Sequence, residues 1–444
     1  MKRGILVILL FLAITHIFGQ SRLIEIDKEY ANINIDRDNN LNYSFRLKKG
    51  NLYVFSVLQQ GIDVKLIFTD ENNKQILEKD SPNGQNGYEK FEYSPTQTKI
   101  YQLKIVRLDE DGNSEKGQVT ILVKKLSKSE IELREKIKKE LEPENKKTVQ
   151  TLDIDHFWEA FDNLKHCKTR KDSINSFQTI YLDRGTDGLK DFIEAREFTA
   201  EKFVNQVSNF PKFYNSIRKN TIEAKNSVAI IEDVVNKFRE IYPNFKPKKI
   251  CFAIGLINTG GTVSENFLLI GTEVTTSTKD VDLSEFNNNA YSKVLSSGTD
   301  IGQNIKNMVS HEYVHTQQKY SLNKDAINCP LLYAILHEGI CDFIGELISG
   351  SQINKVAHTY GDRHEKQLWT ELKNELCNES IANWLYNHKS VKEKPADLGY
   401  YMGYKIAEEY YKNARDKRQA IIDIIEMEDP IKFLQISKYD QKKK

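Results

Sequence analysis

The segment His311-Glu-Tyr-Val-His315 constrains the local fold more than any other part of the chain. Residues four apart lie on one face of an α-helix, so the two imidazoles can reach a single Zn²⁺ only if this segment is helical. Glu312 then lies beside the metal, where its carboxylate can act on a water molecule held there. Residues 301–310 carry apolar side chains at helical spacing, which predicts that the helix begins before the motif. The alternative is a surface helix that carries two histidines by chance.

A catalytic zinc ion takes three protein ligands and keeps one position for water, so a third donor is needed. Residues 330–350 are almost wholly apolar, with a proline at the start and a glycine at the end, which predicts a buried helix. Glu338 and Asp342 lie four apart on it, and buried carboxylates are costly unless they are paired or bind a metal. We therefore expect Glu338 to be the third ligand. Asp342 would accept a hydrogen bond from the distal nitrogen of a ligand histidine.

Other interpretations of this helix stay open. His337 and Glu346 are rival third ligands, and the two carboxylates could instead meet Lys or Arg from elsewhere. Cys341 could bind zinc as a thiolate, although a single Cys in an apolar helix more often fills a core. Gly339 and Gly345 would let this helix and the motif helix approach each other closely.

The pair of motifs, His311-Glu-x-x-His315 and Glu338-x-x-x-Asp342, resembles the gluzincin branch of the zinc metallopeptidases, the thermolysin-like enzymes. Within that branch the chain looks most like a family of bacterial predicted zinc-dependent proteases of largely unassigned substrate, over about residues 150–440. The resemblance implies that His311, His315 and Glu338 bind zinc, that Glu312 is the general base and that Asp342 orients a ligand. A sister group resembles gliding-motility lipoproteins with no obvious need for catalysis, but the intact motif here favours activity. Further matching stretches are Phe157-Trp158, residues 181–189, Ile254-Gly255, residues 260–262, Ile270-Gly271 and residues 398–404.

Thermolysin-like enzymes stabilise the tetrahedral oxyanion with a downstream Tyr or His, so the resemblance implies such a residue here. The pattern Gly399-Tyr-Tyr-Met-Gly403 makes Tyr400 or Tyr401 the preferred catalytic donor. Aromatic residues at this spacing more often belong to a core. The other candidates are Tyr404, His358 and His364.

Two apolar runs upstream of the motif predict strands. Residues 250–257 and 267–270 read as buried neighbouring strands. Thermolysin-like folds bind an extended peptide along an edge strand beside the motif helix, so the resemblance implies such a strand here. Gly260 and Gly261 would permit close backbone approach of a substrate, although an ordinary glycine-containing hairpin loop explains them equally well.

The first 20 residues predict a secretory signal peptide, because two basic residues precede a short apolar run and small or polar residues follow it. No Cys follows that run, so a lipobox is absent, and no later stretch could serve as a transmembrane anchor. We expect an exported protein, periplasmic or extracellular. The formal charge of +1 becomes about −1 once Lys2 and Arg3 leave with the signal. Without a basic patch interleaved with aromatic residues, no nucleic-acid partner is expected.

Residues 22–125 predict an all-β sandwich, because apolar residues alternate with polar ones between regularly spaced turn signals. This part resembles the pre-peptidase C-terminal domain, a jelly-roll-like accessory module of secreted peptidases. Asp63 or Asp80 could belong to a Ca²⁺ site, although solvated loop acids are the simpler interpretation. Residues 126–150 are charge-dense and predict an exposed, partly helical linker. The metallopeptidase-like domain, α+β and mainly helical, is expected over residues 151–440.

The leading hypothesis is a secreted zinc metallopeptidase acting on peptides or proteins. An envelope-associated interaction protein with a structural zinc site would hold the metal with four protein ligands. A metal-dependent amidase acting on non-protein amides would use the same groups as the peptidase. The five Cys form an odd set in which Cys329 with Cys377 is one conceivable pair among several. The oligomeric state is not legible from the sequence.

Overall fold

The computed structural model describes residues 21–442 except 82–83, 110–111, 288–289, 299, 320–328 and 389. The expected signal peptide therefore lies outside the described residues. The chain divides into two compact units, Met1–Lys136 and Ile137–Lys444. Among the helices of the described part, none combines the length and apolar character that a membrane crossing requires.

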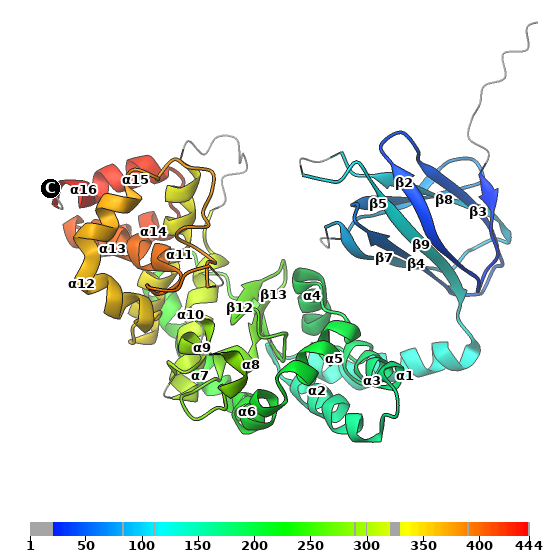
Figure 1. Ribbon diagram of the computed structural model, residues 1–444, viewed down its shortest axis with the longest axis horizontal. Helices are drawn as coiled ribbons and strands as arrows, with labels where there is room; N and C mark the ends of the chain where they lie inside the picture. The colour runs from blue at the N-terminus through cyan, green and yellow to red at the C-terminus, as the bar shows by residue number, and fades with distance from the viewer. Residues whose placement is uncertain are drawn as a thin grey trace, which may run out of the picture. The chain divides into compact units, whose positions relative to one another are not determined.

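The first unit consists of two sheets that share one apolar core (Figure 1). One sheet has the order β1-β3-β8-β5-β6 and the other β2-β9-β4-β7. Strand β4 shows why they pack together: Tyr53, Phe55 and Val57 alternate with half-exposed residues, and the Phe55 ring lies 5.0 Å from the ring of Phe68, which belongs to β5 of the other sheet. The β-rich fold expected for this part is confirmed. The strands are β1 (Arg22–Leu23), β2 (Glu29–Asp36), β3 (Leu41–Leu47), β4 (Tyr53–Gln60), β5 (Val64–Asp70), β6 (Gln75–Lys79), β7 (Asn86–Tyr93), β8 (Lys99–Arg107) and β9 (Lys116–Lys125).

The segment expected to be a charged linker is mostly helix α1 (Lys128–Asn145). Near its end, the buried carboxylate of Glu144 accepts the N–H groups of Thr151 and Leu152 at 2.7 and 3.2 Å. These are free N–H groups at the start of α2 (Leu152–Asn163), so Glu144 caps that helix. The exact domain boundaries drawn from the sequence stay predictions.

The second unit is built around a four-stranded sheet of order β10-β11-β13-β12. Its strands are β10 (Val149–Gln150), β11 (Lys249–Ala253), β12 (Gly261–Val263) and β13 (Phe267–Gly271). β11 and β13 are neighbours, as expected, and run parallel, while β12 forms an antiparallel hairpin with β13 and lies at the edge of the sheet. Gly261 therefore begins a strand that lies at the sheet edge and is also one arm of a hairpin.

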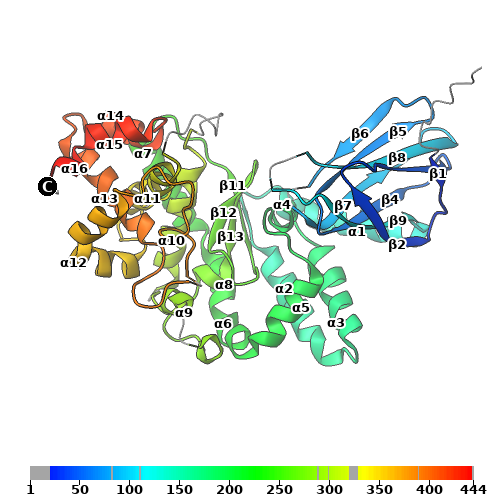
Figure 2. The ribbon, with the colours of Figure 1, turned by 45° about the horizontal axis from the view of Figure 1, so that its top comes forward.

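Helices cover both faces of this sheet, which confirms a mainly helical second unit. α2 and α4 pack against β11, and α10 packs against β12 and β13 from the other side (Figure 2). Helices α11, α12 and α13 lie beyond α10, and α11 packs directly on it. The helices after α2 are α3 (Arg170–Ser176), α4 (Asp187–Arg196), α5 (Ala200–Asn209), α6 (Pro211–Glu223), α7 (Val228–Ile241), α8 (Thr272–Thr275), α9 (Ala290–Leu295), α10 (Ile301–His315), α11 (Pro330–Ser349), α12 (Lys355–Leu372), α13 (Leu398–Asn413), α14 (Lys417–Ile425), α15 (Pro430–Ser437) and α16 (Tyr439–Lys442), with a π-helix, η2, at Phe177–Leu182.

Two glycines of α11 permit two different close helix contacts. A Cβ on Gly345 would lie 3.3 Å from the backbone nitrogen of His311, so this glycine does bring α11 onto α10 as expected. Gly339 instead faces α13: its Cβ would lie 2.2 Å from the backbone nitrogen of Tyr404 and 2.4 Å from the Cα of Gly403. The expectation for Gly339 was therefore wrong about the partner helix. Helical spacing shows which residues share a face but not which neighbour that face meets.

Candidate metal centre

Helix α10 carries the motif at its C-terminal end. It begins after Asp300, whose side chain accepts the N–H of Gln303 at 2.7 Å. His311, Glu312 and His315 are 7, 6 and 9 % exposed, so the motif faces the interior. The alternative of a surface helix with two chance histidines does not fit this burial.

Three side-chain atoms from α10 and α11 form a small triangle. His311 Nε2 and His315 Nε2 lie 3.1 Å apart, and Glu338 Oε2 lies 3.6 Å from the first and 3.3 Å from the second. Tetrahedral zinc with bonds of about 2.0–2.1 Å keeps its ligand atoms about 3.3–3.4 Å apart. The three donors therefore stand at the mutual separations that one zinc ion requires.

The distal nitrogen of each histidine is held by a hydrogen bond. His311 Nδ1 lies 2.8 Å from Asp342 Oδ1, the partner expected from the sequence. Asn354 donates to the other oxygen of Asp342 at 2.6 Å. His315 Nδ1 lies 2.9 Å from Gln318 Oε1, and the amide of Gln318 donates to the carbonyl of residue 337 at 2.7 Å. Because each Nδ1–H donates a hydrogen bond to one of these oxygens, the proton stays on Nδ1 and both Nε2 atoms are left to bind a cation.

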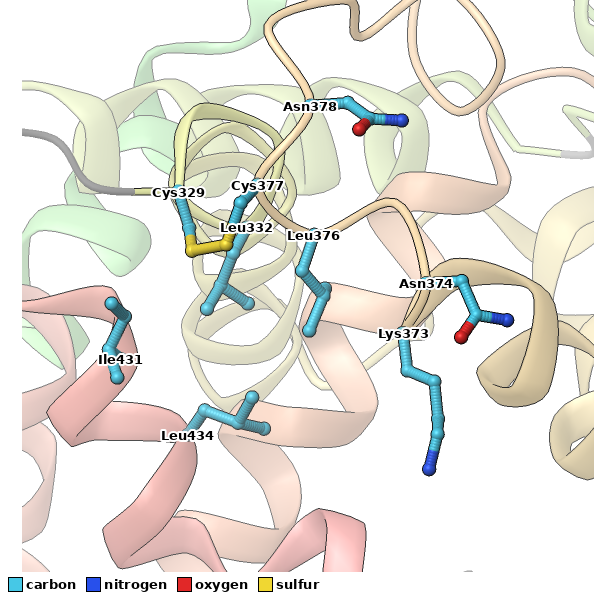
Figure 3. Close-up of a pocket in the computed structure, with 9 residues that line it drawn as sticks. All are labelled: Cys329, Leu332, Lys373, Asn374, Leu376, Cys377, Asn378, Ile431 and Leu434. Atoms are coloured by element: carbon cyan, nitrogen blue, oxygen red, sulfur yellow. A yellow bond between two sulfur atoms is a disulfide. The ribbon is translucent and has the colours of Figure 1, made fainter.

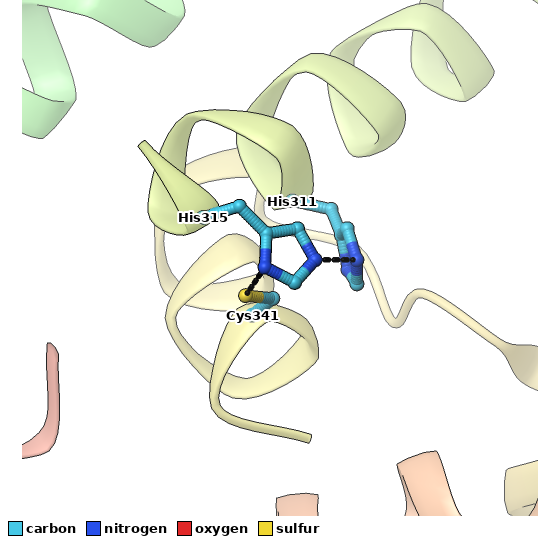
Figure 4. A group of neighbouring side chains, drawn as sticks. All are labelled: His311, His315 and Cys341. Atoms are coloured by element: carbon cyan, nitrogen blue, oxygen red, sulfur yellow. Dashed lines mark hydrogen bonds between the residues drawn. The ribbon is translucent and has the colours of Figure 1, made fainter. Parts of the chain in front are cut away.

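Cys341 is placed at the opposite nitrogen of His315 (Figure 4). Its Sγ lies 3.3 Å from His315 Nδ1, whereas His311 meets Nε2 of the same ring. The grouping of His311, His315 and Cys341 is compact enough for a metal, and so is that of His315, His337 and Glu338. One imidazole cannot point both nitrogens at one ion, so Cys341 does not join the triangle. The His337 ring stacks on the His315 ring, with centroids 4.8 Å apart and planes 27° apart.

Glu346, the other rival ligand, is only half-buried and hydrogen bonds to Tyr404. Burial and the neighbouring carboxylates Glu408 and Asp342 raise its pKa. No contact between Glu346 and the two motif histidines occurs among the described interactions, and the triangle is complete without it.

The protonation pattern of the cluster reflects mutual stabilisation of opposite charges. Burial pulls the pKa of His311 down, but Asp342 and Glu338 outweigh it and raise that pKa well above its usual value. Burial likewise raises the pKa of Glu338, but His315 and His311 outweigh it and hold that pKa well below its usual value. A cation bound to the triangle would take over the role of the histidine protons.

Glu312 lies against the edge strand. A Cβ on Gly261 would stand 2.4 Å from Glu312 Oε1, so only glycine leaves room for this carboxylate. Burial raises the pKa of Glu312, while His315, His311 and Arg196 act in the opposite direction. Arg196, at the end of α4, donates from Nη2 to Thr259 Oγ1 at 3.1 Å. Arg196 carries no periodic or motif signal that sequence reasoning could have used.

Tyr400 and Tyr401, the expected oxyanion donors, contact different side chains. The Tyr400 ring stacks near the His311 ring with centroids 6.1 Å apart. Tyr401 is fully buried, and its hydroxyl donates to Asp362 at 3.1 Å. Tyr386, which the sequence did not single out, donates from its hydroxyl to Glu338 Oε1 and hydrogen bonds to Tyr400. Tyr386 lies in an irregular segment between α12 and α13, where spacing carries no signal.

A disulfide joins Cys329 to Cys377, the pair that the sequence left among several (Figure 3). It ties the start of α11, the helix of Glu338, to the segment that follows α12, and an apolar pocket opens beside it. Cys167, Cys251 and Cys341 are free.

Comparison with known proteins agrees with a zinc protease. Residues 288–429 match the model of a domain family described as Predicted Zn-dependent protease (DUF2268). The match covers the motif histidines, Glu338 and Asp342, but not Gly261 or Arg196. Together with the candidate metal-binding groups, it bears out zinc as the expected cofactor. No curated protein matches the chain.

Two solved structures show a weak likeness to about a quarter of the chain. The pre-peptidase C-terminal domain of a collagenase from Bacillus anthracis is 16 % identical, covers 23 % of this chain and 94 % of its own, and has a TM-score of 0.19. PliG, a periplasmic inhibitor of g-type lysozyme from Salmonella Typhimurium, is 19 % identical, covers 24 % of this chain and 99 % of its own, and has a TM-score of 0.17. At such scores neither likeness carries an argument about function.

Proposed function

We propose that this protein is a secreted zinc metallopeptidase of the gluzincin type, in which His311, His315 and Glu338 bind the metal. The observation that carries the proposal is the triangle of two Nε2 atoms and one carboxylate oxygen, with sides of 3.1–3.6 Å. It supplies three ligands from two packed helices, and a tetrahedral ion then keeps one position for water. A structural site would use four protein ligands instead.

Zinc bound there would supply Lewis acidity, lowering the pKa of a water ligand and polarising a carbonyl. Glu312 accepts the proton of the attacking water and returns it to the leaving amine. Asp342 and Gln318 keep the two imidazoles in the tautomer and orientation that present Nε2. Tyr400 is the oxyanion donor in this proposal, because its ring lies beside the ring of His311, with centroids 6.1 Å apart. Tyr401 is left out because Asp362 engages its hydroxyl.

The edge strand β12 is the proposed binding site for an extended peptide. Gly271 N–H donates to the Gly260 carbonyl at 3.0 Å, and Ser264 N–H donates to the Phe267 carbonyl at 2.9 Å. In an antiparallel ladder, hydrogen-bonded and non-bonded positions alternate, so the N–H and C=O of Gly261 and residue 263 point away from β13. The Gly261 carbonyl already accepts from Thr259 Oγ1 at 2.5 Å. A substrate strand could add to the remaining main-chain groups of this edge, directly beside Glu312.

Export is proposed on two grounds: the signal-like first 20 residues, and the disulfide between Cys329 and Cys377. Disulfides persist in oxidising compartments such as the periplasm or the cell exterior. The sandwich of residues 22–125 is proposed as an accessory module, similar in sequence pattern to pre-peptidase C-terminal domains. The peptidase domain is proposed to cover residues 151–440.

The test compares Glu312→Gln with the unaltered chain on a peptide library. The variant should keep a full zinc complement and lose about 10²–10⁴-fold in kcat, because only the proton acceptor is removed. Glu232→Gln, an exposed change on α7, is the matched control. Unchanged turnover in Glu312→Gln would remove Glu312 from the mechanism. X-ray absorption of the zinc-loaded protein should show three protein donors and one light exchangeable ligand; four protein donors would support a structural zinc site instead. Cleavage of non-protein amides alone would favour the amidase hypothesis.

A further inference from the structure

Arg196 lies where the proposed substrate would pass. Its Nη2 donates to Thr259 Oγ1 at 3.1 Å and to the Gly261 carbonyl at 3.5 Å. The guanidinium therefore lies at the outer edge of β12, where that strand begins. Helix α4, which carries Arg196, packs on the face of the sheet opposite α10, which carries Glu312 (Figure 2). The two side chains therefore approach the same edge from opposite faces.

Arg196 acts to lower the pKa of Glu312 without contacting that carboxylate in an ion pair. Among the described residues, no ion pair joins it to a carboxylate: Glu197 pairs with Lys202, and Asp191 accepts from Ser264. The Nε atom of Arg196 is buried and makes no hydrogen bond within the described part of the chain. A buried guanidinium N–H without an acceptor is costly, so an acceptor arriving with a ligand would be strongly bound.

We propose that Arg196 binds a carboxylate of the substrate close to the scissile peptide bond. This inference rests on the proposed function, since it takes β12 as the peptide site. A carboxylate suits the guanidinium better than a backbone carbonyl does, because its two oxygens match the planar fork and its charge matches the cation. The preferred substrates are therefore peptides with Asp or Glu next to the cleaved bond, or with a free C-terminal carboxylate at that distance.

Three matched peptide sets separate these sources: neutral peptides with amidated ends, the same peptides with Asp or Glu beside the cleaved bond, and neutral peptides with a free C-terminal carboxylate near it. The unaltered protein should favour one of the carboxylate sets over the amidated set by roughly 10- to 100-fold in kcat/KM, as expected for a charge-assisted hydrogen bond. Arg196→Gln should reduce that preference to about threefold or less, with zinc content unchanged. Arg196→Lys, which keeps the charge but loses the fork, should retain part of it. Lys190→Gln, on the exposed side of α4, is the control and should retain all of it.

Calorimetric binding of the same peptides to the Glu312→Gln protein gives a readout that does not need turnover. A carboxylate preference in binding that Arg196→Gln abolishes supports the inference even if no peptide is cleaved, in which case the proposed function alone fails. Equal binding of carboxylate and amidated peptides overturns the inference. A preference that persists in Arg196→Gln also overturns it, whether or not the protein is a peptidase.

Discussion

Glu273 offers a sharp test of how the loop beside the site is held. This residue of α8 is fully buried, and its two oxygens accept the N–H groups of Gly255 at 2.8 Å and Ile257 at 2.9 Å. The same loop is held by Tyr181, which donates to the residue 254 carbonyl at 2.6 Å, and it leads directly into the edge strand at Gly261. Burial raises the pKa of Glu273 to about 7, although the two N–H donors act against that shift.

The replacement Glu273→Gln removes this titration while conserving the shape of the side chain. The ordinary pKa of the carboxyl is 4.5 and the folded-state value is about 7, so the folded protein binds the proton more tightly than the unfolded chain does. The stability that this group contributes is therefore fully present below pH 4.5 and is lost as the pH rises through 7. The difference between the two pKa values amounts to about 3 kcal/mol, at about 1.4 kcal/mol per pH unit.

Urea unfolding of both proteins at several pH values measures the effect. The free energy of unfolding of the unaltered protein, minus that of Glu273→Gln, should fall by about 3 kcal/mol between pH 4.5 and pH 7, because other titrating groups are common to both. Below pH 4.5 the Gln variant should be less stable by about 1–3 kcal/mol, since its amide presents a donor to a backbone N–H. Glu232→Gln, an exposed change of the same kind, is the control and is measured under the same conditions. A flat difference for Glu273→Gln would refute the assignment of this titration to Glu273.

Two further substitutions test the packing around the metal ligands. Asp342→Asn should weaken zinc binding by about 10- to 100-fold, measured by competition with a chelator, because the charged acceptor that orients His311 is lost; an unchanged affinity would show that Asp342 does not support the ligand. Gly339→Ala should lower the free energy of unfolding by about 1–3 kcal/mol, because its Cβ would stand 2.2 Å from the backbone nitrogen of Tyr404; a variant of full stability would mean that α11 and α13 can separate at no cost.

The three proposed zinc ligands could be predicted because they lie on two regular helices, α10 and α11. Spacing alone placed His311 and His315 on one face, and an acid in an apolar helix stood out because burial of an unpaired charge is so costly. Asp342 was expected to orient a histidine, but two other supporting residues were missed: Gln318 follows the end of α10, and Asn354 precedes α12. Irregular segments have no period, so their side-chain directions follow from tertiary packing that a single sequence does not reveal.

Three residues in the irregular segments around the site adopt an unusual backbone conformation. Ile257, Asn354 and Tyr386 have φ values of 55°, 24° and 54°, which L-residues other than Asn and Asp rarely adopt. Each donates a hydrogen bond to a buried carboxylate of the site or its loop: to Glu273, Asp342 and Glu338, respectively. A β-branched residue such as Ile257 keeps this conformation only if the surrounding contacts outweigh its cost of about 1–3 kcal/mol. The strain at Ile257 accompanies the hydrogen bond that its N–H donates to Glu273, which holds the loop leading into β12.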